Sequence, residues 1–71
     1  MAEKFKVPVE KGKTYTIDIL RLGSNGEGVG RVENFTVFVD GALPGETVTA
    51  RITFVKKQYA TGRLEKVRNT G

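Results

Sequence analysis

The stretch Asn25–Arg31, which reads NGEGVGR, carries glycine at every second position and is the first place to look for phosphate-binding chemistry. A phosphate-binding glycine loop needs a helix directly behind it, because the backbone N–H groups at the helix N-terminus hold the anion. Here valines at strand-like spacing follow the glycines, and the pattern G-x-G-x-G matches neither the dinucleotide-binding signature nor the P-loop signature. We therefore exclude a nucleotide-binding loop and expect the glycines to shape a strand.

Gly26, Gly28 and Gly30 are expected to share one face of that strand, because alternate residues of a strand point to the same side. A strand face without side chains is entropically costly, so some feature of the molecule must require it. Two explanations remain open at this point. Either the strands of a small barrel bend and cross closely there, or the bare face lets another backbone or a flat ligand approach.

Residues suited to catalysis or metal binding are scarce. The chain has no Cys and no His, which removes the common zinc ligands and the usual proton shuttle. Four carboxylates near expected turns have no partner base or nucleophile at a suitable spacing, and we interpret them as solubilising turn residues: Glu27, Glu33, Asp40 and Glu46. We therefore expect no enzymatic activity, no catalytic residue, no cofactor, no metal and no small-molecule substrate.

Apolar and polar residues alternate with a period of two after the first dozen residues, which predicts strands rather than helices. One strand passes through the glycine stretch, and the others are expected over residues 14–20, 35–39, 46–55 and 58–67. In the strand over 46–55, Val48, Ala50, Ile52 and Phe54 share one face, and Arg51 projects from the other. Five short strands separated by turn signals predict an all-β fold, a small barrel.

A chain of 71 residues buries only a thin core, and without cysteines no disulfide can reinforce it, so closure by backbone pairing is left to stabilise the domain. We expect an N-terminal arm over residues 1–11, extended or partly flexible. The barrel is expected over residues 12–68, followed by a C-terminal tail over residues 69–71.

Charge is concentrated in the last third of the sequence. The chain has 12 Lys and Arg against 8 Asp and Glu, a net charge of +4, which favours a polyanionic partner. Between Thr47 and Arg68 there are six Lys and Arg residues but only one acid, Glu65. No apolar run approaches the ~20 residues that cross a bilayer, and the N-terminal residues have no apolar stretch of signal-peptide length. We expect a cytoplasmic protein that does not bind membranes.

Strand alternation brings aromatic and cationic residues to the outside of the barrel. Phe38 faces outward if Val37 and Val39 face the core, and Tyr59 shares an outer face with Arg63. Exposed rings among cations form a platform for single-stranded nucleic acid, because bases stack on the rings while the cations meet the phosphates.

Some of these residues have alternative roles. Phe38 could instead pack under the N-terminal arm, whose apolar residues need partners, and Phe35 opens its strand beside a turn, where it could be a ring at a loop tip. Lys56 and Lys57 taken alone could be an ordinary solvated turn. The predicted RNA-binding residues are Arg31, Phe35, Phe38, Arg51, Lys56, Lys57, Tyr59 and Arg63.

Three segments resemble the TRAM domain: GEGVGR, FTVFVDGALPGETVTARI and VKKQYATGRLEKV, within a resemblance that spans about residues 12 to 67. The resemblance implies a small five-stranded antiparallel β-barrel related to oligonucleotide-binding (OB) folds. It also implies RNA binding, with Arg31, Phe35, Phe38 and Tyr59 at positions of RNA contact. Thr61 stands where a second ring on the final strand would strengthen stacking.

TRAM domains occur in tRNA- and rRNA-modifying enzymes and as free-standing small archaeal proteins, which are similar in function to cold-shock proteins. The resemblance and the length favour the free-standing kind, a monomeric archaeal RNA chaperone that binds single-stranded RNA with low sequence specificity and melts its secondary structure. One alternative is a domain that positions tRNA or rRNA for a modification enzyme. An alternative of another class is an SH3-like barrel in which Phe38 and Tyr59 grip an extended peptide.

Overall fold

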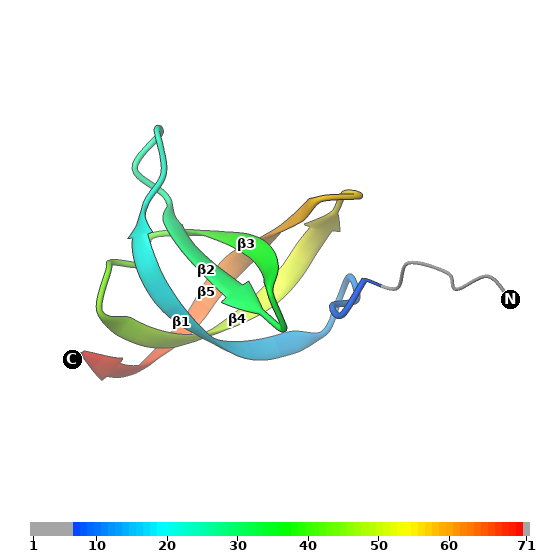
Figure 1. Cartoon of the computed structure of the whole chain (residues 1–71). Coiled ribbons are helices and arrows are strands. Elements are labelled where there is room, and N and C mark those ends of the chain that lie inside the picture. Colours follow the sequence, from blue (N-terminus) through cyan, green and yellow to red (C-terminus); the bar gives the residue numbers. More distant parts are fainter. Residues whose placement is uncertain (1–6, 71) are drawn as a thin grey trace, which may run out of the picture.

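The structure is a computed structural model that describes residues 7–70 of the chain. It contains five strands (Figure 1): β1 (Thr14–Leu22), β2 (Gly28–Val32), β3 (Phe35–Asp40), β4 (Glu46–Val55) and β5 (Tyr59–Thr70). None of the described residues forms a helix long and apolar enough to span a bilayer. Because the described residues form five strands and no helix, the predicted all-β fold is confirmed.

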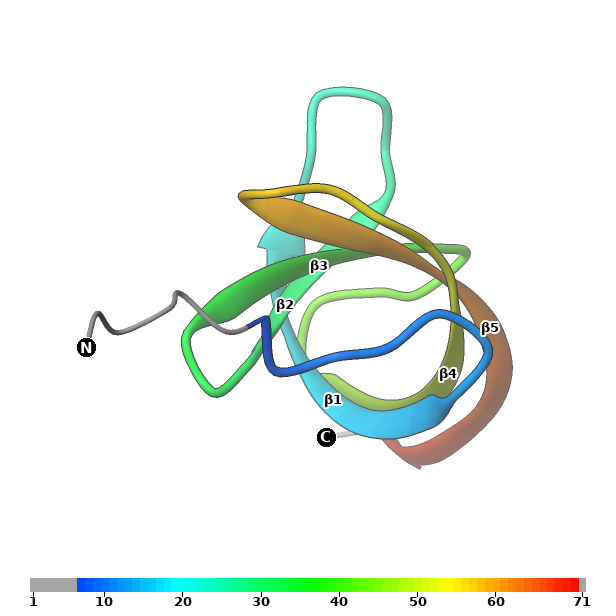
Figure 2. The same cartoon turned by 90° about the vertical axis from the view of Figure 1, so that its right-hand side faces the viewer.

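The five strands form a closed barrel in the order β1-β2-β3-β5-β4, and β4 pairs back onto β1. In Figure 2 the strands surround a common interior, and the connection between β1 and β2 projects beyond it. Four of the pairings are antiparallel, but β3 and β5 run parallel, so the expected wholly antiparallel barrel is wrong in this one pairing. The cause is the connection after β3, which takes β4 across to β1, so that the returning β5 fills the remaining gap beside β3 in the same direction.

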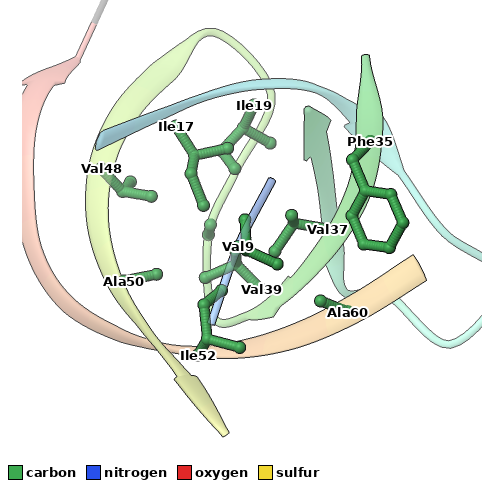
Figure 3. Packing of buried hydrophobic residues seen from close by; sticks show 11 residues of the cluster. Val9, Ile17, Ile19, Phe35, Val37, Val39, Val48, Ala50, Ile52 and Ala60 are labelled. Carbon is green, nitrogen blue, oxygen red and sulfur yellow. The ribbon is translucent and has the colours of Figure 1, made fainter. Parts of the chain in front are cut away.

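Alternate residues of the strands fill the barrel interior (Figure 3), as the period of two predicts. The largest fully buried side chains are Ile17, Ile52, Val37, Val39 and Val48. This small apolar core is surrounded by a closed ladder of paired strands, which removes unpaired strand edges.

Phe35 belongs to this core, so the prediction that it contacts RNA is wrong. Its side chain is only 6% exposed, because Phe35 shares the inward face of β3 with Val37 and Val39 at positions i, i+2 and i+4. The tight turn through Glu33 and Asn34, both with positive φ, brings Phe35 directly into register with β2, so it does not lie at a loop tip.

Gly28 and Gly30 of β2 face the interior, and each lies against the backbone of a neighbouring segment. A Cβ atom added to Gly28 would lie 2.8 Å from the carbonyl oxygen of Ala42, and one added to Gly30 would lie 2.5 Å from that of Asp18. The first explanation, a close crossing of strands, accounts for Gly30, whereas Gly28 is approached by the backbone of Ala42 in the connection between β3 and β4, as the second explanation allows. Gly26 does not share their face, because it lies before β2 in the turn, with a φ of 85°.

The segment before β1 is attached to the barrel. Val9 is buried in the core cluster, and the Gly12 N–H donates a hydrogen bond of 2.7 Å to the carbonyl oxygen of Ile52. Val7 packs against the same cluster, so these arm residues cover the barrel interior rather than Phe38. Phe5 lies outside the described residues. At the other end of the chain, β5 continues to Thr70.

We expect Gly30→Ala to lower the free energy of unfolding by about 1–3 kcal/mol, because the added methyl group meets rigid backbone. Gly62→Ala is the matched control, since its added Cβ would come no closer than 3.3 Å to its neighbours. Urea unfolding followed by far-UV circular dichroism measures both. Equal losses in the two variants would contradict the close crossing of β1 and β2.

Candidate nucleic-acid interface

The outer face of β3 lies between β2 and β5 and carries the candidate rings. Phe38 alternates with the buried Val37 and Val39, so its side chain faces outward as predicted. The parallel pairing of β3 with β5 sets Thr36 opposite Tyr59 and Phe38 opposite Thr61. Residues more than 20 positions apart in the sequence thereby meet on one surface.

Phe38 and Tyr59 form an aromatic pair on this surface. Their ring centroids are 5.3 Å apart at an interplanar angle of 77°, an edge-to-face arrangement of the kind that aromatic pairs favour. Tyr59 is 37% exposed and Phe38 is half-buried, so both rings remain accessible. They line an open groove of about 630 Å³ together with Glu27, Asp40 and Thr61.

A third ring, Phe54, joins the same surface although the alternation of β4 predicts that it faces the core. The register between β4 and β5 shifts between Ile52 and Phe54, and this bulge turns Phe54 outward, where it is 48% exposed. Thr61 therefore has Phe38 opposite it on one side and Phe54 on the other. We call Phe38, Phe54, Tyr59 and Thr61 the ring surface. The missing ring at Thr61 is thus replaced by one from β4.

The predicted RNA-binding Lys and Arg residues differ in whether they already form contacts within the chain. The Nζ atom of Lys56 lies 4.5 Å from the ring centroid of Phe54, so this residue belongs to the edge of the ring surface. The exposed guanidinium of Arg51 already forms contacts within the chain: its Nε donates to Glu65 Oε2 at 3.1 Å, and its Nη1 donates to the Gly12 carbonyl oxygen at 3.1 Å. A role for Arg51 in RNA binding stays a prediction.

The remaining predicted cations lie exposed around the rings. Arg31 pairs in register with Thr36, the residue opposite Tyr59, and Arg63 lies two positions beyond Thr61 on β5. Lys57 is exposed in the connection between β4 and β5. The structure thus gathers two of the predicted rings and four of the predicted cations around β3 and β5, and it adds Phe54.

No pattern in the sequence indicates that Phe54 lies on the ring surface or that Glu27 and Asp40 line the groove. A bulge changes which face a residue occupies without leaving a mark in the apolar pattern, and the two acids resemble ordinary turn residues. Among the described residues no group of three or more Asp, Glu, His or Cys side chains could hold a metal ion.

A small closed β-barrel that presents rings and cations on one side has the architecture of a nucleic-acid-binding module. The model of the TRAM domain family matches residues 8–64, so the chain belongs to the TRAM domain family. TRAM domains are RNA-binding modules. The resemblance inferred from the sequence motifs is confirmed.

Relatives with this domain fall into two groups. The chain is 48% identical over 61 residues to an uncharacterized RNA methyltransferase of Clostridium tetani, of which it spans only 13%, and 86% of this chain is covered. It is 50% identical over 54 residues to an uncharacterized protein of Methanocaldococcus jannaschii, covering 76% of this chain and 70% of that protein. The solution structure of a conserved protein of Methanococcus maripaludis superimposes with a TM-score of 0.78 at 37% identity, covering 83% of this chain and 84% of that one.

We expect Phe38→Ala to weaken the binding of a fluorescein-labelled decauridine by about 1–3 kcal/mol, because a stacked base loses its ring. Fluorescence anisotropy titration measures the affinity. Val67→Ala, which truncates another exposed apolar side chain on β5, is the control and should leave the affinity unchanged. Equal affinities for wild type and Phe38→Ala would contradict the assignment of the ring surface.

Proposed function

We propose that this protein binds single-stranded RNA with low sequence specificity and acts as an RNA chaperone that melts secondary structure, as cold-shock proteins do. The observation that carries the proposal is the exposed pair of Phe38 and Tyr59, held edge to face on the outer side of a closed barrel. Membership of the TRAM domain family supports RNA as the ligand. Under this proposal the protein works as a monomer in the cytoplasm, without cofactor or catalytic activity.

Binding would combine stacking with charge. Bases stack on the ring surface, and every base has a π-face, so stacking alone discriminates little between sequences. Arg31, Lys56, Lys57 and Arg63 would meet the phosphates of the same strand. A single strand can lie along this outer face with its bases turned toward the rings, whereas the bases of a duplex are already stacked on one another.

Melting would follow from selective binding to the open strand. A ligand that binds one of two states shifts the equilibrium toward that state by its difference in affinity, so no ATP is required. Weak binding is an advantage here, because the released RNA can then refold.

A second candidate function is the positioning of tRNA or rRNA for a modification enzyme. The observation that favours it is the similarity to RNA methyltransferases, in which the matched segment is about an eighth of the protein. Both candidate functions use the same surface, and they differ in whether the isolated barrel alone melts RNA.

The proposal is tested with a hairpin RNA that carries a fluorophore and a quencher at its ends. We expect the protein to raise the fluorescence in a dose-dependent way and without ATP, because it traps the open strand. The double variant F38A/Y59A, which keeps every cation, is the control and should leave the hairpin closed. A wild-type protein that binds the RNA but never opens the hairpin would favour the positioning function instead.

Salt dependence reports the ionic part of binding. With these four cations near phosphates, the logarithm of the affinity for a short single strand should fall with the logarithm of salt concentration with a slope of roughly −3. The measurement is an anisotropy titration at several NaCl concentrations. An affinity that does not change between low and moderate salt would contradict the assigned phosphate contacts.

A further inference from the structure

The groove beside the aromatic pair has a lining that generic phosphate binding does not explain. Its residues are two rings, one hydroxyl and two carboxylates, and no cation is among them: Glu27, Phe38, Asp40, Tyr59 and Thr61. A volume of about 630 Å³ lies within the range of small-molecule sites. In a chain of net charge +4, this groove is an acidic and aromatic recess within a basic surface.

The two carboxylates line the same groove. The pairing between β2 and β3 ends with Gly28 opposite Val39, so Glu27, the residue before β2, and Asp40, the last residue of β3, both lie at this end of the strand pair. In the described part of the chain Asp40 forms no salt bridge, although the pairing between β3 and β5 sets Arg63 opposite it.

The Glu27 carboxylate is held in position by the turn that precedes β2. Its Oε1 atom accepts a hydrogen bond of 3.0 Å from the Asn25 N–H. Its Oε2 atom lies over Gly23, where an added Cβ would come within 2.5 Å of it. The Gly23 N–H in turn donates to the Glu27 carbonyl oxygen at 2.7 Å. The turn therefore fixes one carboxylate at the groove and leaves acceptor capacity on it.

Carboxylates discriminate between nucleobases, because an ionised carboxylate only accepts hydrogen bonds. Guanine presents two adjacent donors, N1–H and the N2 amino group, which match the two oxygens of one carboxylate. Adenine and cytosine each offer a single amino group on this edge. Uracil offers one N–H between two carbonyl oxygens, which a carboxylate repels.

We propose that the groove binds one unpaired guanine of the RNA, stacked against the Phe38–Tyr59 pair with its N1–H and N2 amino edge toward Glu27 and Asp40. This inference rests on the proposed RNA binding. It adds a preference for one base at one position of an RNA strand that is otherwise bound with low sequence specificity. The surrounding Lys and Arg residues favour a nucleotide over a cationic peptide, since they attract the phosphates on either side of the base and repel an Arg or Lys side chain that approaches the acids.

The test uses pentanucleotides that differ in the central base: UUGUU, UUAUU, UUCUU and UUUUU, with inosine as a fifth. Anisotropy titrations should give an affinity for UUGUU about five- to tenfold above that for UUUUU, the lower part of the range for specific base contacts. Inosine lacks the N2 amino group, so its affinity should fall between the two.

The variants Glu27→Gln and Asp40→Asn should reduce the preference for guanine to less than about twofold while the affinity for UUUUU stays the same or rises, because each removes a negative charge near RNA. Glu46→Gln is the matched control: Glu46 also accepts a hydrogen bond from the backbone of its own turn, at 2.9 Å from the Leu43 N–H, but does not line the groove. It should keep the full guanine preference.

Each alternative outcome is distinct. Equal affinities for all five RNAs, or an undiminished guanine preference in both groove variants, would overturn the guanine site and leave RNA binding intact. No binding of any of the RNAs would overturn the proposed function itself. An arginine-rich pentapeptide that binds wild type more tightly than UUGUU, and loses binding in Glu27→Gln, would assign the groove to a cationic peptide and also overturn the guanine site.

Discussion

Closure of the strand ladder is the constraint on which the rest of this structure depends. Seventy-one residues without a cysteine cannot form a large core or a disulfide, so the domain is stabilised by joining β4 to β1 and β5 to β3. Closure around so narrow an interior brings β1 against Gly30 and the connection after β3 against Gly28, and an added Cβ at either position would meet backbone. The glycine stretch that resembles a phosphate loop is thus a requirement of the barrel.

The same closure creates the candidate interface. Because β5 enters the gap between β3 and β4, Tyr59 lies beside Phe38 and Thr61 lies between Phe38 and Phe54. The rings, Arg31 and Arg63 project from hydrogen-bonded strands, so their relative positions do not depend on a loop, whereas Lys56 and Lys57 lie in the connection between β4 and β5. A surface held this rigidly loses little conformational entropy when a strand of RNA binds, which suits a small domain that offers few contacts.

Much of this could be predicted from the sequence, because a period of two identifies both strands and their outward faces. The outward directions of Phe38 and Tyr59 follow from the alternation. The same alternation places Phe35 on the buried face of β3 with Val37, so the predicted contact of Phe35 with RNA went against this pattern and is wrong. The direction of β5 and the bulge before Phe54 could not be predicted, because both depend on which strands meet when the barrel closes. For the same reason, the sequence could not predict that Glu27 and Asp40 line the same groove.

An NMR titration of the isotope-labelled protein with a short single-stranded RNA will show whether the rings on β3, β4 and β5 form one RNA-binding face. We expect the amide signals of Phe38, Phe54, Tyr59 and Thr61 to shift together, while those of Thr16 and Thr49, where β1 pairs with β4, remain in place. Shifts centred on the β1–β4 side, with the ring surface unaffected, would contradict an RNA-binding face formed by the rings.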